Sequence, residues 1–416
     1  MRIVDVCGFY SPDGGGIRTY VEEKLRLAER LGQDITILAP GAADATEVIS
    51  PSARLMTIAS PRFPLDRKYF SFTDQQAVHR ALDFLQPDVV EASSPWNSAN
   101  YVAAWPRATP RSLVMHSEPL SAHAYRWFER IVEPPAVDRA FDWFWQRLRR
   151  YGQAFDAVIV ANSSLAQRLS AGGVDNIMTV PMGVQPGVFS PSRRDEALRR
   201  RLLAMCTLGP EATLLLCAGR LATEKRVPML VEAATIAGRT RPIGLVIFGE
   251  GRAHREVLRA IAGNPHVRLL RPVRERAQFA TVLASADALL HGCEAETFGM
   301  IAAEADASGI PLVAPAMGGA SDFVRDTALG FTPADTSDVV RAILELPVGT
   351  RKAIAPRSPR SMEEHFRDLY RIYAGLGSVG ANARTAAPQP WPTGRISWPG
   401  ACATKLQLRL LETIGD

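Results

Sequence analysis

The chain has 416 residues, of which 47% are hydrophobic, 7% aromatic and 22% charged. Such a composition is typical of a soluble globular protein and excludes a disordered one, and the length favours two domains over one. The formal net charge of +5 suits anionic ligands such as nucleotides, or an anionic membrane surface. Because no dense Lys/Arg stripe with interleaved aromatics occurs in the sequence, we expect no nucleic-acid partner.

The five cysteines are scattered along the sequence and form no C-x-x-C pair, so the sequence predicts neither a disulfide framework nor a zinc site. Residues 1–6 lead directly into a strand-like apolar run, without the charged and apolar regions of a signal peptide. No uninterrupted apolar run reaches the roughly 18 residues of a transmembrane helix. We therefore expect a cytoplasmic protein.

Short apolar or β-branched runs alternate with longer helical patterns over most of the chain. The predicted strands are 3–6, 35–38, 89–91, 113–115 and 158–160 in the first half, and 214–218, 245–248, 267–270, 288–290 and 311–314 in the second. Alternation of this kind indicates an α/β fold whose parallel sheets are covered on both faces.

The strand–helix pattern starts anew at 214–218, after a polar and Arg-rich stretch at 186–201 that is typical of an interdomain linker. Residues 361–373 show helical spacing, whereas the residues after them are rich in Ala, Pro, Gly and Trp and hold no regular period. We predict an N-terminal Rossmann-like domain over 1–185, a C-terminal one over 186–360, a terminal helix over 361–375 that returns to the N-domain, and a poorly ordered tail over 376–416.

Two glycine-bearing turns follow predicted strands. Gly15 and Gly16 lie between the first strand and a helical pattern, where backbone N–H groups and the helix dipole favour an anion, although a turn without a ligand explains them equally well. Gly249 and Gly251 end the strand 245–248 and indicate either close backbone approach or a simple turn. Taken alone, neither of these turns establishes a ligand site.

Two charged segments carry more chemistry. Arg220 and Lys225 follow the strand 214–218, where parallel sheets place their ligands, and both can reach one pyrophosphate; a solvated basic loop is the alternative. Glu296 and Glu304 flank a loop–helix junction, with Phe298, Gly299 and Met300 at the start of the helix. Glu304 stands among small residues, so its carboxylate needs a hydrogen-bonding partner if it is buried.

Taken together and in order, these segments resemble the sugar-donor signature of the large family of retaining glycosyltransferases numbered family 4. The matching segments are Gly15–Gly16, 180–191, Arg220 with Lys225, 248–251, and Glu296-x7-Glu304 with Phe298–Gly299. The resemblance covers residues 1 to about 375. It implies a GT-B fold, in which two Rossmann-like domains with parallel sheets face an interdomain cleft.

The resemblance also implies a role for each matching residue. Arg220 and Lys225 bind the donor diphosphate and stabilise the leaving group, which makes a metal ion unnecessary, and the sequence accordingly has no D-x-D pair. Glu304 holds the ribose hydroxyls. Glu296 and the backbone at Gly249 and 298–300 hold the transferred sugar and its phosphate.

His116 follows the strand 113–115 and matches the active-site histidine of the family. The resemblance gives it contact with the sugar and with the oxocarbenium-like transition state, and it implies retention of the anomeric configuration. The other six histidines are interpreted as structural. Met182 and Gln185 depart from the Asn and Asp of the family's linker motif, so the interdomain elbow is expected to differ.

Residues 3–20 are similar to mannosyltransferases of this family that build lipid-linked mannosides or cell-envelope polysaccharides. GDP-mannose is therefore the first expectation for the donor, with UDP-glucose or another UDP-sugar second, and the acceptor is expected to be a lipid or a glycan. The alternatives are an epimerase, for which no added acid/base set is found, and a catalytically silent nucleotide-sugar-binding protein, which would be expected to lack Lys225, Glu304 or His116.

The segment 137–155 combines aromatic residues with Arg147, Arg149 and Arg150. Such a segment can dock peripherally on an anionic bilayer at the inner face of the membrane. A helix that packs its aromatics into the core is the alternative, and it is favoured by the general burial of aromatic side chains.

Overall fold

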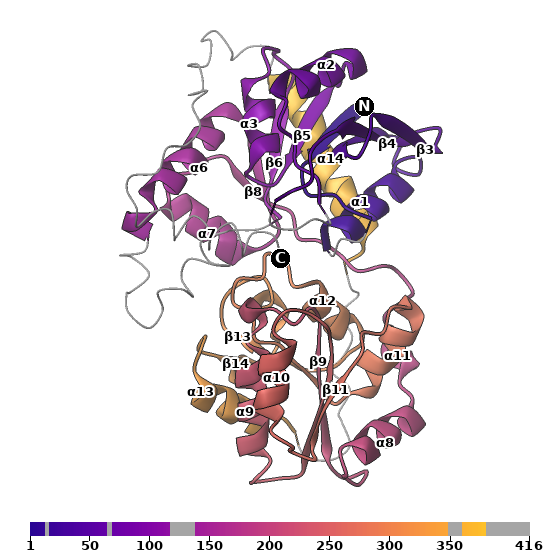
Figure 1. Cartoon of the computed structure of the whole chain (residues 1–416), viewed down its shortest axis with the longest axis vertical. Coiled ribbons are helices and arrows are strands. Elements are labelled where there is room, and N and C mark those ends of the chain that lie inside the picture. The colour runs from indigo at the N-terminus through magenta and orange to yellow at the C-terminus, as the bar shows by residue number, and fades with distance from the viewer. Residues whose placement is uncertain (13–15, 65–68, 117–137, 348–359, 380–416) are drawn as a thin grey trace. The chain divides into compact units, whose positions relative to one another are not determined.

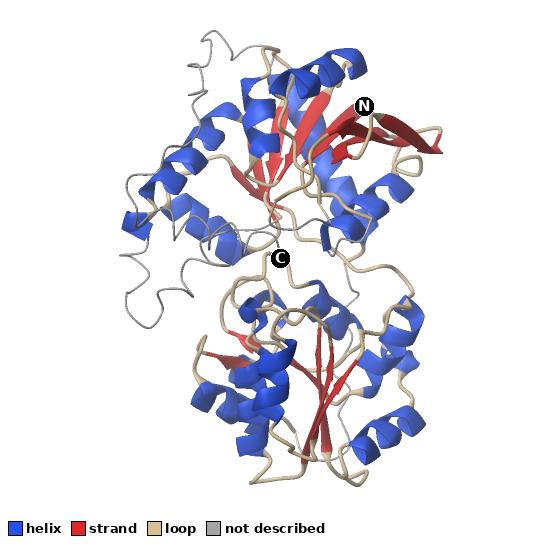
Figure 2. Cartoon of the chain, viewed as in Figure 1, coloured by secondary structure: helices blue, strands red, loops and turns tan. Residues whose placement is uncertain are grey.

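The computed structural model describes residues 1–12, 16–64, 69–116, 138–347 and 360–379. The chain forms two compact units, each an α/β arrangement in which helices pack against a sheet (Figures 1 and 2). The first unit contains residues 1–161 and 165–180 and the described residues from Glu363 onward; the second contains 162–164 and 181–362. Each unit is described here by itself.

The sheet of the first unit has the strand order β3-β4-β2-β1-β5-β6-β7-β8, and every neighbouring pair is parallel except β3 with β4. Its strands are β1 (Arg2–Cys7), β2 (Asp34–Gly41), β3 (Ala45–Ser50), β4 (Ala53–Ala59), β5 (Val89–Ser93), β6 (Arg111–Val114), β7 (Ala157–Val160) and β8 (Ile177–Thr179). The central strands β5 and β7 are buried along their whole length, and β1 is buried except at Arg2, as expected of a parallel sheet covered by helices.

The described helices of the first unit are α1 (Gly16–Leu27), α2 (Gln75–Leu85), α3 (Asn97–Ala104), α6 (Asp142–Ala154), α7 (Ser163–Ala171) and α14 (Met362–Val379). Asp74 caps α2 by accepting a hydrogen bond from the backbone N–H of Ala77, a typical N-terminal signal. The helix α14 comes from the far end of the chain, and its Tyr373 donates to Glu91 of β5 in the interior of this unit.

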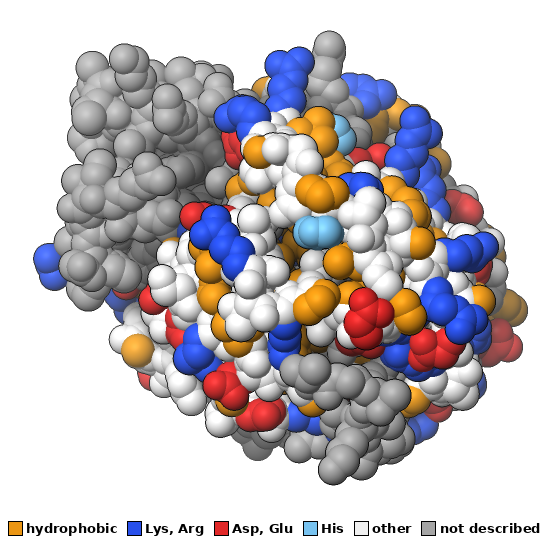
Figure 3. Space-filling view, turned by 90° about the horizontal axis from the view of Figure 1, so that it is seen from below, with side chains coloured by type: hydrophobic (Ala, Val, Ile, Leu, Met, Phe, Trp, Pro, Cys, Tyr) orange, Lys and Arg blue, Asp and Glu red, His pale blue; other side chains and the backbone are white. Residues whose placement is uncertain are grey.

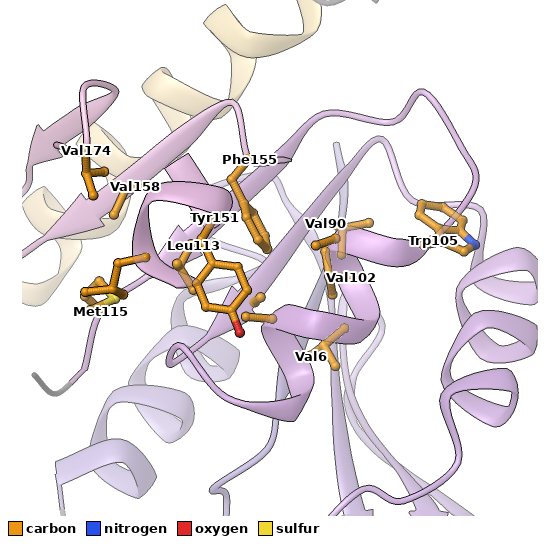
Figure 4. Close-up of a cluster of buried hydrophobic side chains, with 14 of the residues drawn as sticks. Val6, Val90, Val102, Trp105, Leu113, Met115, Tyr151, Phe155, Val158 and Val174 are labelled. Carbon is orange, nitrogen blue, oxygen red and sulfur yellow. The ribbon is translucent and has the colours of Figure 1, made fainter. Parts of the chain in front are cut away.

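The core of the first unit includes the aromatic face of α6. Figure 4 shows Tyr151 and Phe155 among side chains from the neighbouring strands, including Leu113 and Val158. Tyr151 is completely buried and Phe155 nearly so. Burial of large aromatic side chains is the main stabilising contribution that this helix makes.

The sheet of the second unit has the order β11-β10-β9-β12-β13-β14, and all of its pairs are parallel. Its strands are β9 (Thr213–Ala218), β10 (Ile243–Phe248), β11 (Val267–Leu270), β12 (Ala288–Leu290), β13 (Leu312–Pro315) and β14 (Gly330–Phe331). Because the strands run in the same direction, the loops after β9, β10 and β12 leave the same edge of the sheet.

The described α-helices of the second unit are α8 (Glu196–Met205), α9 (Val227–Ala237), α10 (His254–Ile261), α11 (Arg276–Ser285), α12 (Met300–Ala307) and α13 (Thr336–Leu344). Acidic residues cap three of them: the side chains of Asp195, Glu275 and Asp335 accept backbone N–H bonds at the starts of α8, α11 and α13. No described helix combines the length and apolar character that crossing a membrane requires.

All ten strands predicted from the sequence are present in the structure, with small errors at their ends. β6 stops at Val114, so Met115 lies just beyond it, and α14 continues to Val379, into the segment predicted as a poorly ordered tail. The remainder of that tail, 380–416, lies outside the described residues. The sequence missed β3, β4 and the short strands β8 and β14. In β3, residues 45–49 are all exposed and therefore show no burial pattern.

Candidate functional site

The carboxyl ends of β9 and β12 bring together two charged loops of the second unit. β9 and β12 are parallel neighbours, with Leu216 paired to Leu289. The loop after β9 carries Arg220 and Lys225, and the loop after β12 carries Glu296. The sequence placed these residues after strands, and the topology explains why the two loops meet at one edge of the sheet.

Lys225 and Glu296 form an ion pair between Nζ and Oε2 that joins the two loops. Burial alone would lower the pKa of Lys225, but the Glu296 carboxylate outweighs it and raises that pKa above its usual range. Burial would likewise raise the pKa of Glu296, yet the Lys225 ammonium and then the neighbouring His291 and Arg220 lower it to about 2. The pair is therefore ionised at neutral pH.

A second ion pair, between Arg226 and Glu294, joins the same two loops. The Arg226 guanidinium donates from Nη2 to Glu294 Oε1 at 2.7 Å and from Nε to Glu294 Oε2 at 3.1 Å. Both side chains are largely buried. Sequence reasoning missed this pair because its significance depends on two residues that are 68 positions apart. The two ion pairs fix the geometry of the site.

Arg220 lies near these two ion pairs and remains accessible to solvent. Its side chain is about half exposed, and Nη2 lies 3.4 Å from Glu224 Oε1. A guanidinium that is loosely held and partly exposed is well suited to bind an incoming anion. Arg220 also contributes to the low pKa of Glu296, which places its positive charge near that carboxylate.

The glycines after β10 serve the packing of a neighbouring loop. A Cβ atom on Gly249 would lie 2.5 Å from the Gly219 carbonyl oxygen, and one on Gly251 would lie 2.4 Å from the Leu221 carbonyl oxygen. Leu221 N–H donates to the Glu250 carbonyl at 2.8 Å. The close backbone approach at this turn is to the loop that carries Arg220.

Glu304 lies inside α12, and only 3% of the residue is exposed. Its Oε1 accepts a hydrogen bond from Nη2 of Arg276, the first residue of α11, at 2.7 Å. Burial raises the pKa of Glu304, and Arg276 opposes that shift. The expectation that a buried carboxylate here needs a partner is confirmed, and Arg276 is a residue that the sequence did not single out.

The start of α12 carries the other predicted residues of this region. Gly299 precedes the helix, Met300 is its first residue, and Phe298 is buried against Phe323. The backbone N–H groups at the start of a helix have no partners within the helix, so this end of α12 favours oxygen atoms and anions.

His116 belongs to the first unit, two residues beyond β6. Its ring makes an edge contact with Tyr20 of α1, with centroids 4.7 Å apart. Burial lowers the pKa of His116 to about 4, so the imidazole is neutral at physiological pH. Gly16 begins α1. Gly15 lies outside the described residues.

His291 is a residue that the sequence interpretation treated as structural. It follows β12 directly, and its Nε2 lies 3.6 Å from Glu296 Oε2. Potential ligand atoms of His291, Cys293 and Glu296 lie within 4.8 Å of one another, which is close enough for a metal ion. A metal bound there would compete with the Lys225 ammonium for Glu296, so the present arrangement fits an ion pair better.

The segment 137–155 was considered as one that docks on a bilayer, but the large aromatic side chains of its helix α6 pack mainly into the core of the first unit. Phe144 and Trp145 are buried, Arg147 lies over the Tyr151 ring, and Arg149 pairs with Asp142. The alternative of a core helix therefore describes α6. On the face of the molecule seen in Figure 3, Lys and Arg side chains are interspersed with acidic and apolar ones.

Two family models match this chain. A family model described as Glycosyltransferase Family 4 matches residues 14–188, and one described as Glycosyl transferases group 1 matches residues 212–347. The second match includes the β9, β10 and β12 loops and both glutamates.

Individual relatives span most of the chain. A GDP-mannose-dependent alpha-(1-6)-phosphatidylinositol dimannoside mannosyltransferase of Mycobacterium tuberculosis is 27% identical, with 94% of this chain and 99% of that protein covered. A GDP-mannose-dependent alpha-mannosyltransferase of Corynebacterium glutamicum is 25% identical, with 79% and 76% covered. Sucrose-phosphate synthase from Thermosynechococcus elongatus shares the fold, with a TM-score of 0.65, 17% identity, and 91% and 96% of the two chains covered.

Proposed function

We propose that this chain, which belongs to the group 1 and family 4 glycosyltransferases with the GT-B fold, transfers mannose from GDP-mannose to a lipid-linked or polysaccharide acceptor. We also propose retention of the anomeric configuration and independence from metal ions. The observation that carries the proposal is the Lys225–Glu296 ion pair beside Arg220, at the edge of the sheet where α/β folds bind ligands.

The two cations provide the chemistry that departure of a nucleoside diphosphate needs. As the glycosidic bond breaks, negative charge accumulates on the diphosphate, and Arg220 and Lys225 stabilise it electrostatically. Lys225 stays protonated because its pKa is raised, so it acts as a fixed positive charge rather than as a proton donor. Two cations in these positions replace the divalent ion that other transferases use.

The carboxylates hold the hydroxyl-bearing parts of the donor. Glu296 is ionised and accepts hydrogen bonds from the transferred hexose, while the backbone of 298–300 binds its oxygens. Glu304, held by Arg276, accepts from the ribose. His116 of the first unit is neutral at physiological pH, so its imidazole can take part in hydrogen bonds without carrying charge.

The names of the relatives support mannose and GDP over the alternatives. Two of them are described as GDP-mannose-dependent mannosyltransferases, and the name of one includes phosphatidylinositol dimannoside. We therefore propose that the acceptor is a lipid-linked mannoside, which a cytoplasmic enzyme meets at the inner face of the membrane. Flotation with anionic vesicles tests this location; absence of binding at low salt contradicts it.

Thermal shift with GDP-mannose, GDP, UDP-glucose, UDP-GlcNAc and UDP tests the donor, because a ligand of the folded state raises the melting temperature. We expect the largest shifts with GDP-mannose and GDP. A larger shift with a UDP-sugar would replace the proposed donor, and no shift with any member of the panel would overturn the proposed function.

Catalysis is tested separately from binding. Incubation with GDP-mannose and phosphatidylinositol dimannoside is expected to give a mannosylated lipid, with loss of turnover in Lys225→Ala and Glu304→Ala. Arg255→Ala, which removes an exposed cation of α10, is the matched control and is expected to retain activity. Donor binding without transfer to any lipid or glycan acceptor would favour the silent binding protein instead.

A further inference from the structure

His291 occupies a fixed position next to the two charged loops. It is the first residue after β12, and its backbone N–H continues the sheet pairing by donating to the Val313 carbonyl at 2.9 Å. The following residue is held just as tightly, because a Cβ atom on Gly292 would lie 2.6 Å from the Lys225 carbonyl oxygen. The imidazole is thus positioned by the sheet on one side and by the Lys225 loop on the other.

One nitrogen of this imidazole has an unsatisfied hydrogen-bonding capacity. His291 is 95% buried, as its exposed fraction is 5%. Within the described residues, no hydrogen-bond partner is found for Nε2. A buried polar atom left without a partner costs free energy, and such atoms are rare in folded proteins. The nearest acceptor to consider, Glu296 Oε2, lies 3.6 Å away and is already bound by Lys225.

The charge state of His291 narrows the class of ligand. Burial lowers its pKa to about 4, so the ring is neutral under physiological conditions and does not attract an anion by charge. With its proton on Nε2, the neutral imidazole donates to a hydroxyl oxygen, and the same hydroxyl can donate its own proton to the Glu296 carboxylate. The distance of 3.6 Å allows one hydroxyl oxygen to lie within about 3 Å of both Nε2 and Glu296 Oε2.

We propose that His291 and Glu296 together bind one hydroxyl group of the transferred hexose, which makes His291 a determinant of sugar specificity. This inference rests on the proposed function. Without a donor, the Lys225 ammonium occupies Glu296 Oε2. When the donor diphosphate draws Lys225 away, Glu296 Oε2 becomes available, and the hydroxyl completes the hydrogen bonding of both side chains.

The experiment compares a nucleotide sugar with its nucleoside diphosphate, because only the former carries the hexose. Calorimetric affinities for GDP-mannose and GDP are measured on the wild type, on His291→Leu, which removes the ring nitrogens, and on His291→Gln, which keeps a polar group at similar reach. We expect His291→Leu to bind GDP-mannose about tenfold more weakly, with GDP affinity unchanged, and His291→Gln to recover most of the loss.

His266→Leu is the matched control. His266 also lies in the second unit, and its Nδ1 contacts the Cys206 carbonyl at 2.9 Å, away from the charged loops. A general loss of stability on removing a histidine would affect both variants and both ligands. Equal weakening of GDP and GDP-mannose in His291→Leu, or no weakening of either, would overturn the role of His291.

Monodeoxy analogues of GDP-mannose identify the hydroxyl. The analogue that lacks it is expected to bind the wild type about tenfold more weakly and to show no further loss in His291→Leu, since the two changes remove the same interaction. If every analogue loses the same factor in the variant as GDP-mannose does, His291 contacts no hydroxyl. Failure of the wild type to bind any nucleotide sugar refutes the proposed function instead, so the two failures are distinguishable.

Discussion

Replacement of Lys24 by Met is expected to destabilise the first unit strongly. Lys24 of α1 lies between two carboxylates, with Nζ 2.9 Å from Asp5 Oδ2 and 2.6 Å from Glu91 Oε2. All three side chains are fully buried. Removing the cation leaves the two carboxylates to repel each other in a low-dielectric interior, which costs about 3–5 kcal/mol.

That loss is a large part of the stability of a typical domain, which is about 5–15 kcal/mol. For a unit of this size it corresponds to a lower melting temperature by about 6–20 °C. Differential scanning calorimetry resolves the change as a shift of one transition. Arg107→Gln removes an exposed pair with Asp83 in the same unit and is the matched control, with little or no loss of stability expected.

The pH dependence gives a second test with a definite sign. Burial, and then the Asp5 charge, already raise the pKa of Glu91 to about 7. A carboxyl group whose pKa is raised on folding contributes stability at low pH that is lost as the pH rises through the folded value. The deficit of Lys24→Met is therefore expected to be larger at pH 8 than at pH 5. An equal deficit at both pH values, or one below about 1 kcal/mol, would refute this account of the cluster.

Three further predictions concern the site. Dialysis against EDTA is expected to leave transfer unchanged, because Lys225 and Arg220 are proposed to take the place of a metal ion; a loss that Mg²⁺ or Mn²⁺ restores would contradict this. Arg276→Gln is expected to weaken GDP binding about tenfold by releasing Glu304, as measured by calorimetry, and unchanged affinity would count against that role. The His116 ring is expected to stay neutral from pH 5.5 to 8 in NMR titrations, because burial lowers its pKa to about 4, and a midpoint near 6.5 would show that it is solvated.

The position of much of the candidate site could be predicted from local sequence. Arg220, Lys225 and Glu296 each follow a run of apolar residues, and such runs identify parallel strands whose carboxyl ends share one edge. The burial of Glu304 was also predictable, because it stands among alanines and other small residues. Local patterns of this kind predict the structure of one segment. They therefore place a residue correctly where its position depends only on that segment and the strand before it.

The remainder depends on partners that are distant in the sequence. In the sequence, Arg226 looks like an ordinary basic loop residue and Arg276 like an ordinary residue at the start of a helix. Only the fold shows that Arg226 pairs with Glu294 and that Arg276 pairs with Glu304. Lys24 sits in an amphipathic helix where a solvated lysine is the ordinary expectation, yet β1 and β5 place a carboxylate on either side of it. No spacing rule in a single sequence identifies these neighbours.

The ion pair between Lys225 and Glu296 gives the free site a way to keep its charges compensated. Each side chain is assigned to a different part of the donor, Lys225 to the diphosphate and Glu296 to the hexose. In the free protein the two satisfy each other, which holds the pKa of Glu296 near 2 and that of Lys225 above its usual range. Under the proposed function, binding of the donor separates them, and both gain their new partners only from a ligand that carries a phosphate and a sugar hydroxyl together. A nucleoside diphosphate alone would leave the Glu296 carboxylate uncompensated, so the ion pair itself favours the intact donor over the released product.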